Sequence, residues 1–327
     1  MGLVPSGLVE SLLFQPPRPP SYTNTPNFFQ LVTTHNSSIQ CFFVQVENPA
    51  YTILFSHGNA EDIGMIFEWF KEIALQLNCN VFGYDYTGYG LSYSEVGPAE
   101  KYCFSDIQAA FDYLTGTEGI LARDIILYGR SLGSGASCEL AMRQSAKNDP
   151  VGGVILQSPL MSAYRVAFNF KYTMPGDMMC NIDKVPHINS LVFVIHGNRD
   201  EIVPFFHGEE LYLGTKVQYR YEPFWVDGAG HNNIEMCVRK TDPQLFFQKL
   251  RDFLEYARSH PEGHDMTDAQ VEKKKKAKSY SMEDHLFCCA KGNAGYYDDD
   301  EDGGERMTEY HSDKLTIHTP RKAAPQK

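Results

Sequence analysis

Hydrophobic residues in the middle of the chain gather into short runs, separated by longer amphipathic stretches. The runs are apolar at consecutive positions, as in parallel strands that are buried on both faces. They predict strands at 39–46, 51–56, 79–84, 125–128, 151–156, 191–195 and 219–226. Helical stretches at 62–77, 99–114, 132–146, 205–213 and 241–258 are long enough to cross over between parallel strands. The alternation predicts an α/β fold with a mostly parallel central sheet flanked by helices.

Composition divides the 327 residues into three zones. Residues 1–26 form an apolar leader punctuated by prolines, which we interpret as membrane-associating, and residues 27–260 carry the alternating pattern of one catalytic domain. Residues 261–327 hold a run of lysines, a DDDED run and few large apolar side chains, so we expect a disordered, charged tail. No stretch approaches the roughly 18 apolar residues that span a bilayer. The leader lacks a basic start and is a poor secretory signal.

Charge and cysteine content exclude several classes of function. The chain has 29 Lys and Arg against 41 Asp and Glu, a formal net charge of −12, which argues against a nucleic-acid partner. The eight cysteines form no CxxC pair, so neither a zinc site nor a disulfide framework is indicated. The histidines also lack partners at metal-ligand spacing. We therefore expect no metal and no other cofactor.

The strongest chemical motif follows the predicted strand at 125–128, where residues 129–133 read G-R-S-L-G. A G-x-S-x-G pattern between a strand and a helix is typical of a nucleophile elbow, which holds the serine in a strained turn with its hydroxyl exposed. The glycines leave room for the sharp turn and for a substrate. Ser131 is therefore the predicted nucleophile. The alternative is an ordinary glycine- and serine-rich loop that caps the helix.

A serine hydroxyl needs an imidazole that takes its proton and an acid that orients the imidazole. The predicted strand at 191–195 runs into HGNRDE, where Asp200 is the candidate acid and Glu201 its substitute. The predicted strand at 219–226 runs into DGAGHN, where glycines let His231 reach the elbow as the base. The order Ser, Asp, His is that of α/β-hydrolases. Taken singly, His231 reads equally well as a buried or helix-capping histidine, and Asp200 as a turn former.

Acyl transfer also requires two backbone N–H groups that stabilise the negatively charged oxygen of the intermediate. Leu132, directly after the nucleophile, supplies one of them. The second is expected in the loop after the strand at 51–56, from Asn59 or Ala60. We interpret His57 in the same loop as a structural residue that fixes the turn, although its spacing also permits a catalytic role.

Two further stretches are expected near the site. Residues 84–90 read YDYTGYG, which we interpret as a fixed turn beside the elbow rather than a second acidic site. Residues 159–186 occupy the position where such folds insert a cap. Its flexible thioethers and rings suit an irregular apolar groove for the substrate. The candidates for that groove are Met161, Phe168, Phe170 and Met174. The alternative is a cap that packs its own small core.

Seven longer motifs occur in one order between about residues 14 and 258. They read FQPPRPPSY, LFSHGNAEDIG, GYDYTGYGLS, ILYGRSLGSG, LQSPLMSAYRVAF, VIHGNRDEIVPFFHG and EPFWVDGAGHNNIE. On these motifs the chain resembles the α/β-hydrolase domain-containing 17 family of membrane-attached acyl-protein thioesterases. The resemblance implies the α/β-hydrolase fold and a serine hydrolase that removes S-linked fatty acyl groups from membrane-bound proteins. It also implies Ser131, Asp200 and His231 as the triad.

Two positions depart from the family pattern. The family usually carries Gln immediately before the nucleophile, whereas this chain has Arg130. Animal members attach to membranes through a cysteine-rich N-terminus, and residues 1–40 here contain no cysteine. We therefore expect a different charge beside the nucleophile and a different anchor.

The first six residues, MGLVPS, fit the N-myristoylation pattern, in which Gly2 is acylated after Met1 is removed. The pattern is loose, and a chance match is the alternative. One myristoyl chain binds a membrane only weakly, so a second contact is expected. The candidates are the apolar leader, palmitoylation of Cys288 and Cys289, and the lysines at 273–276 and 278. We expect peripheral attachment to the cytoplasmic face of the plasma membrane or an internal membrane.

Two other functions stay open at this point. A lipase or carboxylesterase that acts on lipid or small esters would use the same residues. A noncatalytic membrane adaptor on a hydrolase fold would not need them, and the filled triad positions argue against it.

Overall fold

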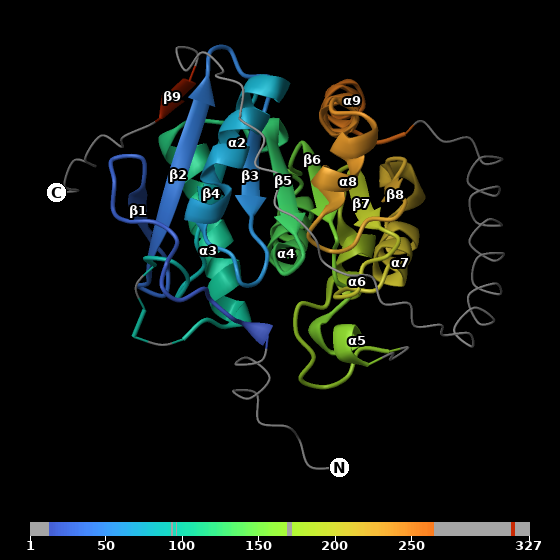
Figure 1. The fold of residues 1–327 in the computed structure, drawn as a ribbon, viewed down its shortest axis with the longest axis horizontal. Helices are drawn as coiled ribbons and strands as arrows, with labels where there is room; N and C mark the ends of the chain where they lie inside the picture. The colour runs from blue at the N-terminus through green and yellow to red at the C-terminus, as the bar shows by residue number, and fades with distance from the viewer. Residues whose placement is uncertain (1–12, 93, 96, 169–171, 265–314, 318–327) are drawn as a thin grey trace. The chain divides into compact units, whose positions relative to one another are not determined.

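The computed structural model describes residues 13–92, 94–95, 97–168, 172–264 and 315–317, and its centre is one sheet (Figure 1). The strands are β1 (Phe29–Val32), β2 (Ser38–Val46), β3 (Thr52–Ser56), β4 (Asn80–Tyr84), β5 (Ile125–Arg130), β6 (Gly153–Gln157), β7 (Val192–Gly197), β8 (Phe224–Val226) and β9 (Leu315–Ile317). They are ordered β1-β2-β4-β3-β5-β6-β7-β8, and β9 also pairs with β2. Strands β3 to β8 are parallel, and β2 pairs antiparallel with its neighbours. The predicted α/β class with a mostly parallel sheet is confirmed.

Helices cover both faces of this sheet. One layer holds α2 (Ile63–Leu77), α8 (Ile234–Thr241) and α9 (Leu245–Ser259), and the other holds α3 (Glu100–Asp112), α4 (Gly133–Ala146), α6 (Asn181–Lys184) and α7 (Phe206–Gly214). Alternate residues of each buried strand serve the two layers. In β3, Ile53 and Phe55 belong to the core cluster under α2 and α9, whereas Leu54 belongs to the cluster under α3 and α4. The runs are apolar throughout because both of their faces are covered.

Local sequence explains the helix that follows β3. Its apolar residues recur every three or four positions, which buries one stripe against the sheet. Asp62 is the N-cap, and its carboxylate accepts a hydrogen bond from the Met65 amide at 3.2 Å. Asn78 ends the helix in the left-handed conformation, with a φ of 47°. The Asp62 cap fixes where α2 begins, and therefore how long the preceding loop is.

Three elements differ from the sequence predictions. The expected strand at 219–226 is a 3₁₀ turn at Val217–Tyr219 followed by the short strand β8. The expected helix at 241–258 begins four residues later, as α9 at Leu245, and a separate helix that was not predicted, α8, precedes it at Ile234–Thr241. Strand β1 was not predicted, because a four-residue edge strand buries only one of its side chains fully and leaves a weak pattern.

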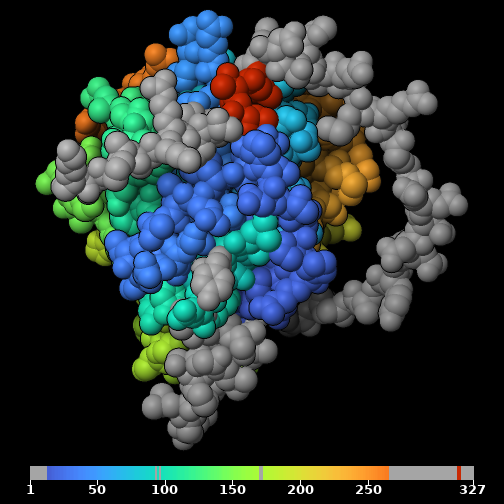
Figure 2. All heavy atoms as spheres, turned by 90° about the vertical axis from the view of Figure 1, so that its left-hand side faces the viewer, coloured from blue at the N-terminus to red at the C-terminus, as the bar shows by residue number. Residues whose placement is uncertain are grey.

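The C-terminal zone was predicted to be disordered, and that prediction is wrong for Leu315–Ile317. These residues form β9, which pairs with Val44–Val46 of β2. In Figure 2 they are drawn in red against the blue N-terminal strands. Leu315 and Ile317 pack partly buried against the core cluster that lies under α2, which gives this short segment an apolar contact as well as backbone hydrogen bonds.

The described part of the leader packs onto the domain. Phe14 is 4% exposed and belongs to the core cluster under α3 and α4. Packed structure therefore begins before the boundary at residue 27 that composition indicated. None of the helices in the described ranges is both long and apolar enough to cross a bilayer.

Candidate active site

Ser131 lies in a turn between β5 and α4 whose geometry requires small neighbours. The serine has a φ of 50°, a left-handed conformation that non-glycine residues rarely adopt. A Cβ at Gly133 would lie 2.0 Å from the carbonyl oxygen of Ser56, and a Cβ at Gly129 would lie 2.5 Å from that of Gly133. Both glycines are therefore needed for close backbone approach. The contact with Ser56 also brings the end of β3 against the start of α4.

Three side chains from three strand ends meet at this turn. The Nε2 atom of His231, which follows β8, lies 2.9 Å from the Ser131 hydroxyl oxygen. The Nδ1 atom of His231 lies 2.7 Å from Oδ2 of Asp200, which follows β7. The exposed fractions are 9% for Ser131, 7% for His231 and 8% for Asp200. A carboxylate at Nδ1 favours the tautomer with its proton on Nδ1, which leaves Nε2 free to accept the serine proton.

Asp200 is surrounded by donors. Its Oδ1 accepts hydrogen bonds from the amides of Ile202 at 3.0 Å and Val203 at 2.8 Å. Its Oδ2 lies 3.1 Å from Nε2 of a second histidine, His196, which is fully buried. Burial alone would raise the pKa of Asp200, but the hydrogen bonds from His196 and His231 outweigh it and hold the pKa well below its ordinary value. Asp200 therefore carries a negative charge beside the imidazole.

His196 was not a candidate from the sequence. It is the second-last residue of strand β7, four residues before Asp200, in the HGNRD motif that supplied the acid. Its Nε2 atom also lies 2.9 Å from the Val203 carbonyl oxygen. From sequence, a histidine within a buried strand is interpreted as a core residue. Asp200 reaches it only because the loop after β7 turns back toward the strand. Glu201, the substitute acid, lies instead against Gly230, where a Cβ would be 2.6 Å from its Oε2.

The loop at residues 57–62, which we call the oxyanion loop, follows β3 and lies next to the elbow. The Gly58 N–H donates to Oε2 of Glu61 at 2.8 Å, so it is committed within the loop. The next residues are the expected donors Asn59 and Ala60, and Ala60 has a φ of 54°. Leu132 lies on the other side, between Ser131 and the start of α4. The expected oxyanion residues thus lie on two segments that the Ser56–Gly133 contact holds together.

Arg130, the departure from the family pattern, forms an ion pair with Glu61. Burial would raise the pKa of Glu61, but the Arg130 guanidinium outweighs burial and lowers it. The two side chains are about one fifth exposed, at 20% and 22%. The positive charge next to the nucleophile is therefore neutralised by the oxyanion loop itself.

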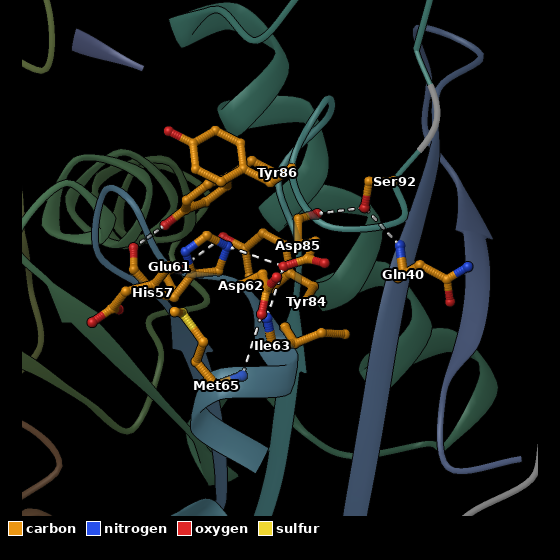
Figure 3. Close-up of polar contacts among 12 residues, drawn as sticks. Gln40, His57, Glu61, Asp62, Ile63, Met65, Tyr84, Asp85, Tyr86 and Ser92 are labelled. Atoms are coloured by element: carbon orange, nitrogen blue, oxygen red, sulfur yellow. Dashed lines mark hydrogen bonds and ion pairs between the residues drawn. The ribbon is translucent and has the colours of Figure 1, made fainter. Parts of the chain in front are cut away.

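His57, the first residue of the oxyanion loop, belongs to a second polar cluster that also contains Asp85 and Tyr86 (Figure 3). Its Nδ1 atom lies 2.8 Å from the Gly58 carbonyl oxygen, and its Nε2 atom lies 3.4 Å from Oδ1 of Asp85. The Tyr86 hydroxyl donates to the His57 carbonyl at 2.6 Å. Oδ1 of Asp85 also accepts from the Ile63 amide at 2.9 Å, at the start of α2. The YDYTGYG stretch thus packs under the oxyanion loop, where His57 and Asp85 hold its shape.

The side chains expected to line an apolar groove lie in different environments. Met161 is buried in the core, whereas Phe168 and Met174 are exposed. Phe170 lies outside the described residues. The cap instead has a polar centre, where buried Arg165 donates to the Ser162 hydroxyl at 3.0 Å and the Thr173 hydroxyl at 3.2 Å. Among the described residues, these side chains do not gather into a small core of the cap either, and the substrate groove stays a prediction.

The remaining predicted positions give little further chemistry. Gly2, Cys288 and Cys289 lie outside the described residues, as does the lysine run. Within the described ranges, no group of three or more His, Cys, Asp or Glu side chains is arranged to hold a metal ion.

Comparison with known proteins supports the fold and a hydrolase activity. The model of the serine aminopeptidase S33 family, Hydrolase_4, matches residues 47–173. Human alpha/beta hydrolase domain-containing protein 17B is 42% identical over 228 residues, which cover 69% of this chain and 74% of that protein. The Caenorhabditis elegans alpha/beta hydrolase domain-containing protein aho-3 is 36% identical over 277 residues, which cover 77% of this chain and 79% of that protein. An esterase of Pyrococcus furiosus shares the fold, with a TM-score of 0.57 at 18% identity over 74% of this chain and 98% of its own.

The fold, the elbow and the hydrogen-bonded Ser, His and Asp side chains define this protein as a serine hydrolase of the α/β-hydrolase class. The identity to the curated relatives extends over most of both chains. The chain belongs to the α/β-hydrolase domain-containing protein 17 family.

Proposed function

We propose that this protein is an acyl-protein thioesterase that cleaves S-linked fatty acyl groups, such as palmitoyl, from membrane-associated proteins. One observation carries the proposal. Ser131, His231 and Asp200 form an unbroken row of hydrogen bonds, at 2.9 and 2.7 Å, on a strained strand-to-helix turn. The family resemblance supplies the substrate class.

Acylation begins when His231 Nε2 takes the Ser131 proton and Oγ attacks the thioester carbonyl carbon. The carbonyl oxygen becomes an oxyanion that the N–H groups of Leu132 and of Asn59 or Ala60 stabilise. The intermediate collapses, the carbon–sulfur bond breaks, and the cysteine sulfur leaves and takes up the proton held by His231, which restores the neutral imidazole. Because a thiol has a pKa of about 8.5, its sulfur leaves with little help from the protonated imidazole.

Deacylation repeats the sequence with water. His231 takes a proton from the water molecule, whose oxygen attacks the acyl-enzyme carbonyl, and the Ser131 oxygen leaves with that proton. The products are the free fatty acid and the restored hydroxyl. Asp200 keeps its negative charge throughout and stabilises the imidazolium that forms in each half.

We also propose that the protein attaches peripherally to the cytoplasmic face of a membrane, through Gly2, the apolar leader and Cys288 and Cys289. The distribution of large exposed apolar side chains supports a membrane near the site. Most of those on the described residues follow the carboxyl ends of the parallel strands, where Ser131 lies: Met65, Phe168, Tyr172, Met174, Ile202 and Met236.

Activity is tested with a fluorophosphonate probe and a matched pair of palmitoyl thioester and oxyester substrates. We expect labelling of the wild-type protein, none of Ser131→Ala, and faster turnover of the thioester. Absence of Ser131-dependent labelling would favour the noncatalytic adaptor. Equal or faster oxyester turnover would make the protein a lipase or carboxylesterase instead.

Attachment is tested by cell fractionation. We expect the Gly2→Ala, Cys288→Ser, Cys289→Ser triple variant to move from the membrane to the cytosolic fraction. An unchanged membrane fraction would assign attachment to the apolar leader.

A further inference from the structure

Residues 13–22, which we call the N-terminal strap, form hydrogen bonds with two residues of the oxyanion loop, Asn59 and Asp62. At one end, the side-chain amide of Asn59 pairs with the strap backbone. Its Nδ2 donates to the Leu13 carbonyl at 2.7 Å, and its Oδ1 accepts from the Gln15 N–H at 2.9 Å. The Tyr89 hydroxyl donates to the same Oδ1 at 2.7 Å. The Asn59 side-chain amide thus donates to one strap residue and accepts from another, as the backbone of a paired β-strand does.

At the other end, the strap meets Asp62, the last residue of the oxyanion loop. The Ser21 N–H donates to Oδ2 of Asp62 at 2.7 Å, and the Ser21 hydroxyl donates to Oδ1. The adjacent Tyr22 hydroxyl donates to Asp85, the buried partner of His57. A Cβ at Gly64 would lie 2.5 Å from the Ser21 Oγ. Position 64, at the start of α2, must therefore be glycine for the strap to pack against it.

The strap between these ends is suited to hold its position. Four of its residues are proline, which restricts the backbone and lowers the entropy lost on ordering. Phe14 is buried in the core between the two residues that bind Asn59. The strap is therefore anchored by packing, and its hydrogen bonds transmit that position to the loop.

Two features of the oxyanion loop make this support necessary. The Gly58 N–H is bound to Glu61, which leaves Asn59 or Ala60 to donate to the oxyanion. Ala60 lies at a φ of 54°, which its own side chain disfavours. A donor that stabilises a transition state must be held within about 0.5 Å of its working position.

We propose that the N-terminal strap is a positioning element of the active site, which holds the oxyanion donor of the loop in place. The inference rests on the proposed serine hydrolase function and adds to it a group of residues remote from the triad. Loss of a strap contact should therefore lower kcat, because the oxyanion forms after substrate binds, and leave KM nearly unchanged.

The test is kinetic and uses the full chain with a chromogenic ester. Asn59→Ala removes the amide but keeps the backbone N–H, and Gln15→Pro removes one strap N–H. We expect kcat to fall about tenfold to a hundredfold in Asn59→Ala and about fivefold in Gln15→Pro, at nearly constant KM. Gln15→Ala, which keeps its N–H, should fall less than Gln15→Pro. Hydrogen exchange of residues 57–62 should quicken in the same order.

Three results would overturn the proposal. One is a kcat within twofold of wild type for both Asn59→Ala and Gln15→Pro. Another is an equal loss in Gln15→Ala and Gln15→Pro. The third is a rise in KM at constant kcat, which would make the strap part of substrate binding. If Gln15→Pro fails to fold, Asn59→Ala decides alone. A wild-type protein without Ser131-dependent turnover would refute the proposed function, and hydrogen exchange would still report whether the strap holds the loop.

Discussion

Two of the histidine–aspartate pairs near the carboxyl ends of the parallel strands differ in their distance, their exposure and the group that the other ring nitrogen faces. His231 and Asp200 are 2.7 Å apart, the His231 side chain is 7% exposed, and its other ring nitrogen faces the Ser131 hydroxyl. His57 and Asp85 are 3.4 Å apart and fully buried. The other ring nitrogen of His57 is turned toward the carbonyl of Gly58, in its own loop.

The difference shows that a His–Asp pair can relay a proton only when the other ring nitrogen of the histidine faces a nucleophile. In the first pair, the carboxylate fixes the tautomer and the far nitrogen reaches a nucleophile. In the second pair, the far nitrogen stays on the backbone, and Tyr86 and Tyr89 pack around the ring with centroids at 4.3 and 5.4 Å. The second pair therefore stabilises the loop that the first pair's chemistry uses.

The largest effect is expected from the two acids. Asp200→Asn should lower kcat for ester hydrolysis about 10⁴-fold, because an amide at Nδ1 permits the wrong imidazole tautomer. Asp85→Asn should instead lower the free energy of unfolding by about 1–3 kcal/mol, since it weakens buried hydrogen bonds from Tyr22 and Ile63. Steady-state kinetics and denaturant unfolding of both variants measure the contrast. A greater loss of kcat in Asp85→Asn would reverse the assignment of the pairs.

An intermediate effect is expected from the two histidines. His57→Leu should cost about 2–4 kcal/mol of unfolding free energy, because it leaves Asp85 buried without its imidazole. Its kcat should fall by no more than about 10²–10³, the loss from one oxyanion donor. His231→Leu should abolish fluorophosphonate labelling while the unfolding midpoint changes little. If His57→Leu lost all labelling at unchanged stability, His57 would have to be counted in the catalytic machinery.

The same pairs show what a sequence alone can predict. The elbow, the acid and the base each follow a strand directly, so short motifs placed Ser131, Asp200 and His231 at one edge of the sheet. His57 was interpreted as structural from its loop, and its burial agrees. These residues lie close in sequence to predicted strands, and the carboxyl ends of parallel strands meet at one edge of the sheet.

Contacts between distant segments left no such signal. His196 meets Asp200 only because the loop after β7 turns back on the strand. The leader was interpreted from its apolar composition, whereas the Gln15 and Leu13 contacts with Asn59 depend on how the chain crosses the finished domain. The sequence shows the charge of Arg130, but its partner Glu61 lies 69 residues earlier and no local pattern links them. In the cap, composition indicated apolar side chains but not whether they face the core or solvent.

The smallest effect concerns the second histidine on Asp200, which has no counterpart at Asp85. His196→Leu removes one of the two imidazoles that lower the pKa of Asp200, and His196→Gln, which can still donate, is its control. A carboxyl whose folded pKa lies below its ordinary value of 3.8 stabilises the fold above that value, and this stability is lost as pH falls. The parent should therefore exceed His196→Leu in unfolding free energy by about 1–2 kcal/mol near pH 7, and the difference should shrink as pH falls below about 4. Denaturant unfolding at a series of pH values measures this, with the His196→Gln curve running parallel to that of the parent. If the difference in unfolding free energy between the parent and His196→Leu stayed constant with pH, His196 would contribute packing alone. The His231–Asp200 and His57–Asp85 pairs would then differ chiefly in the group that the other ring nitrogen of each histidine faces.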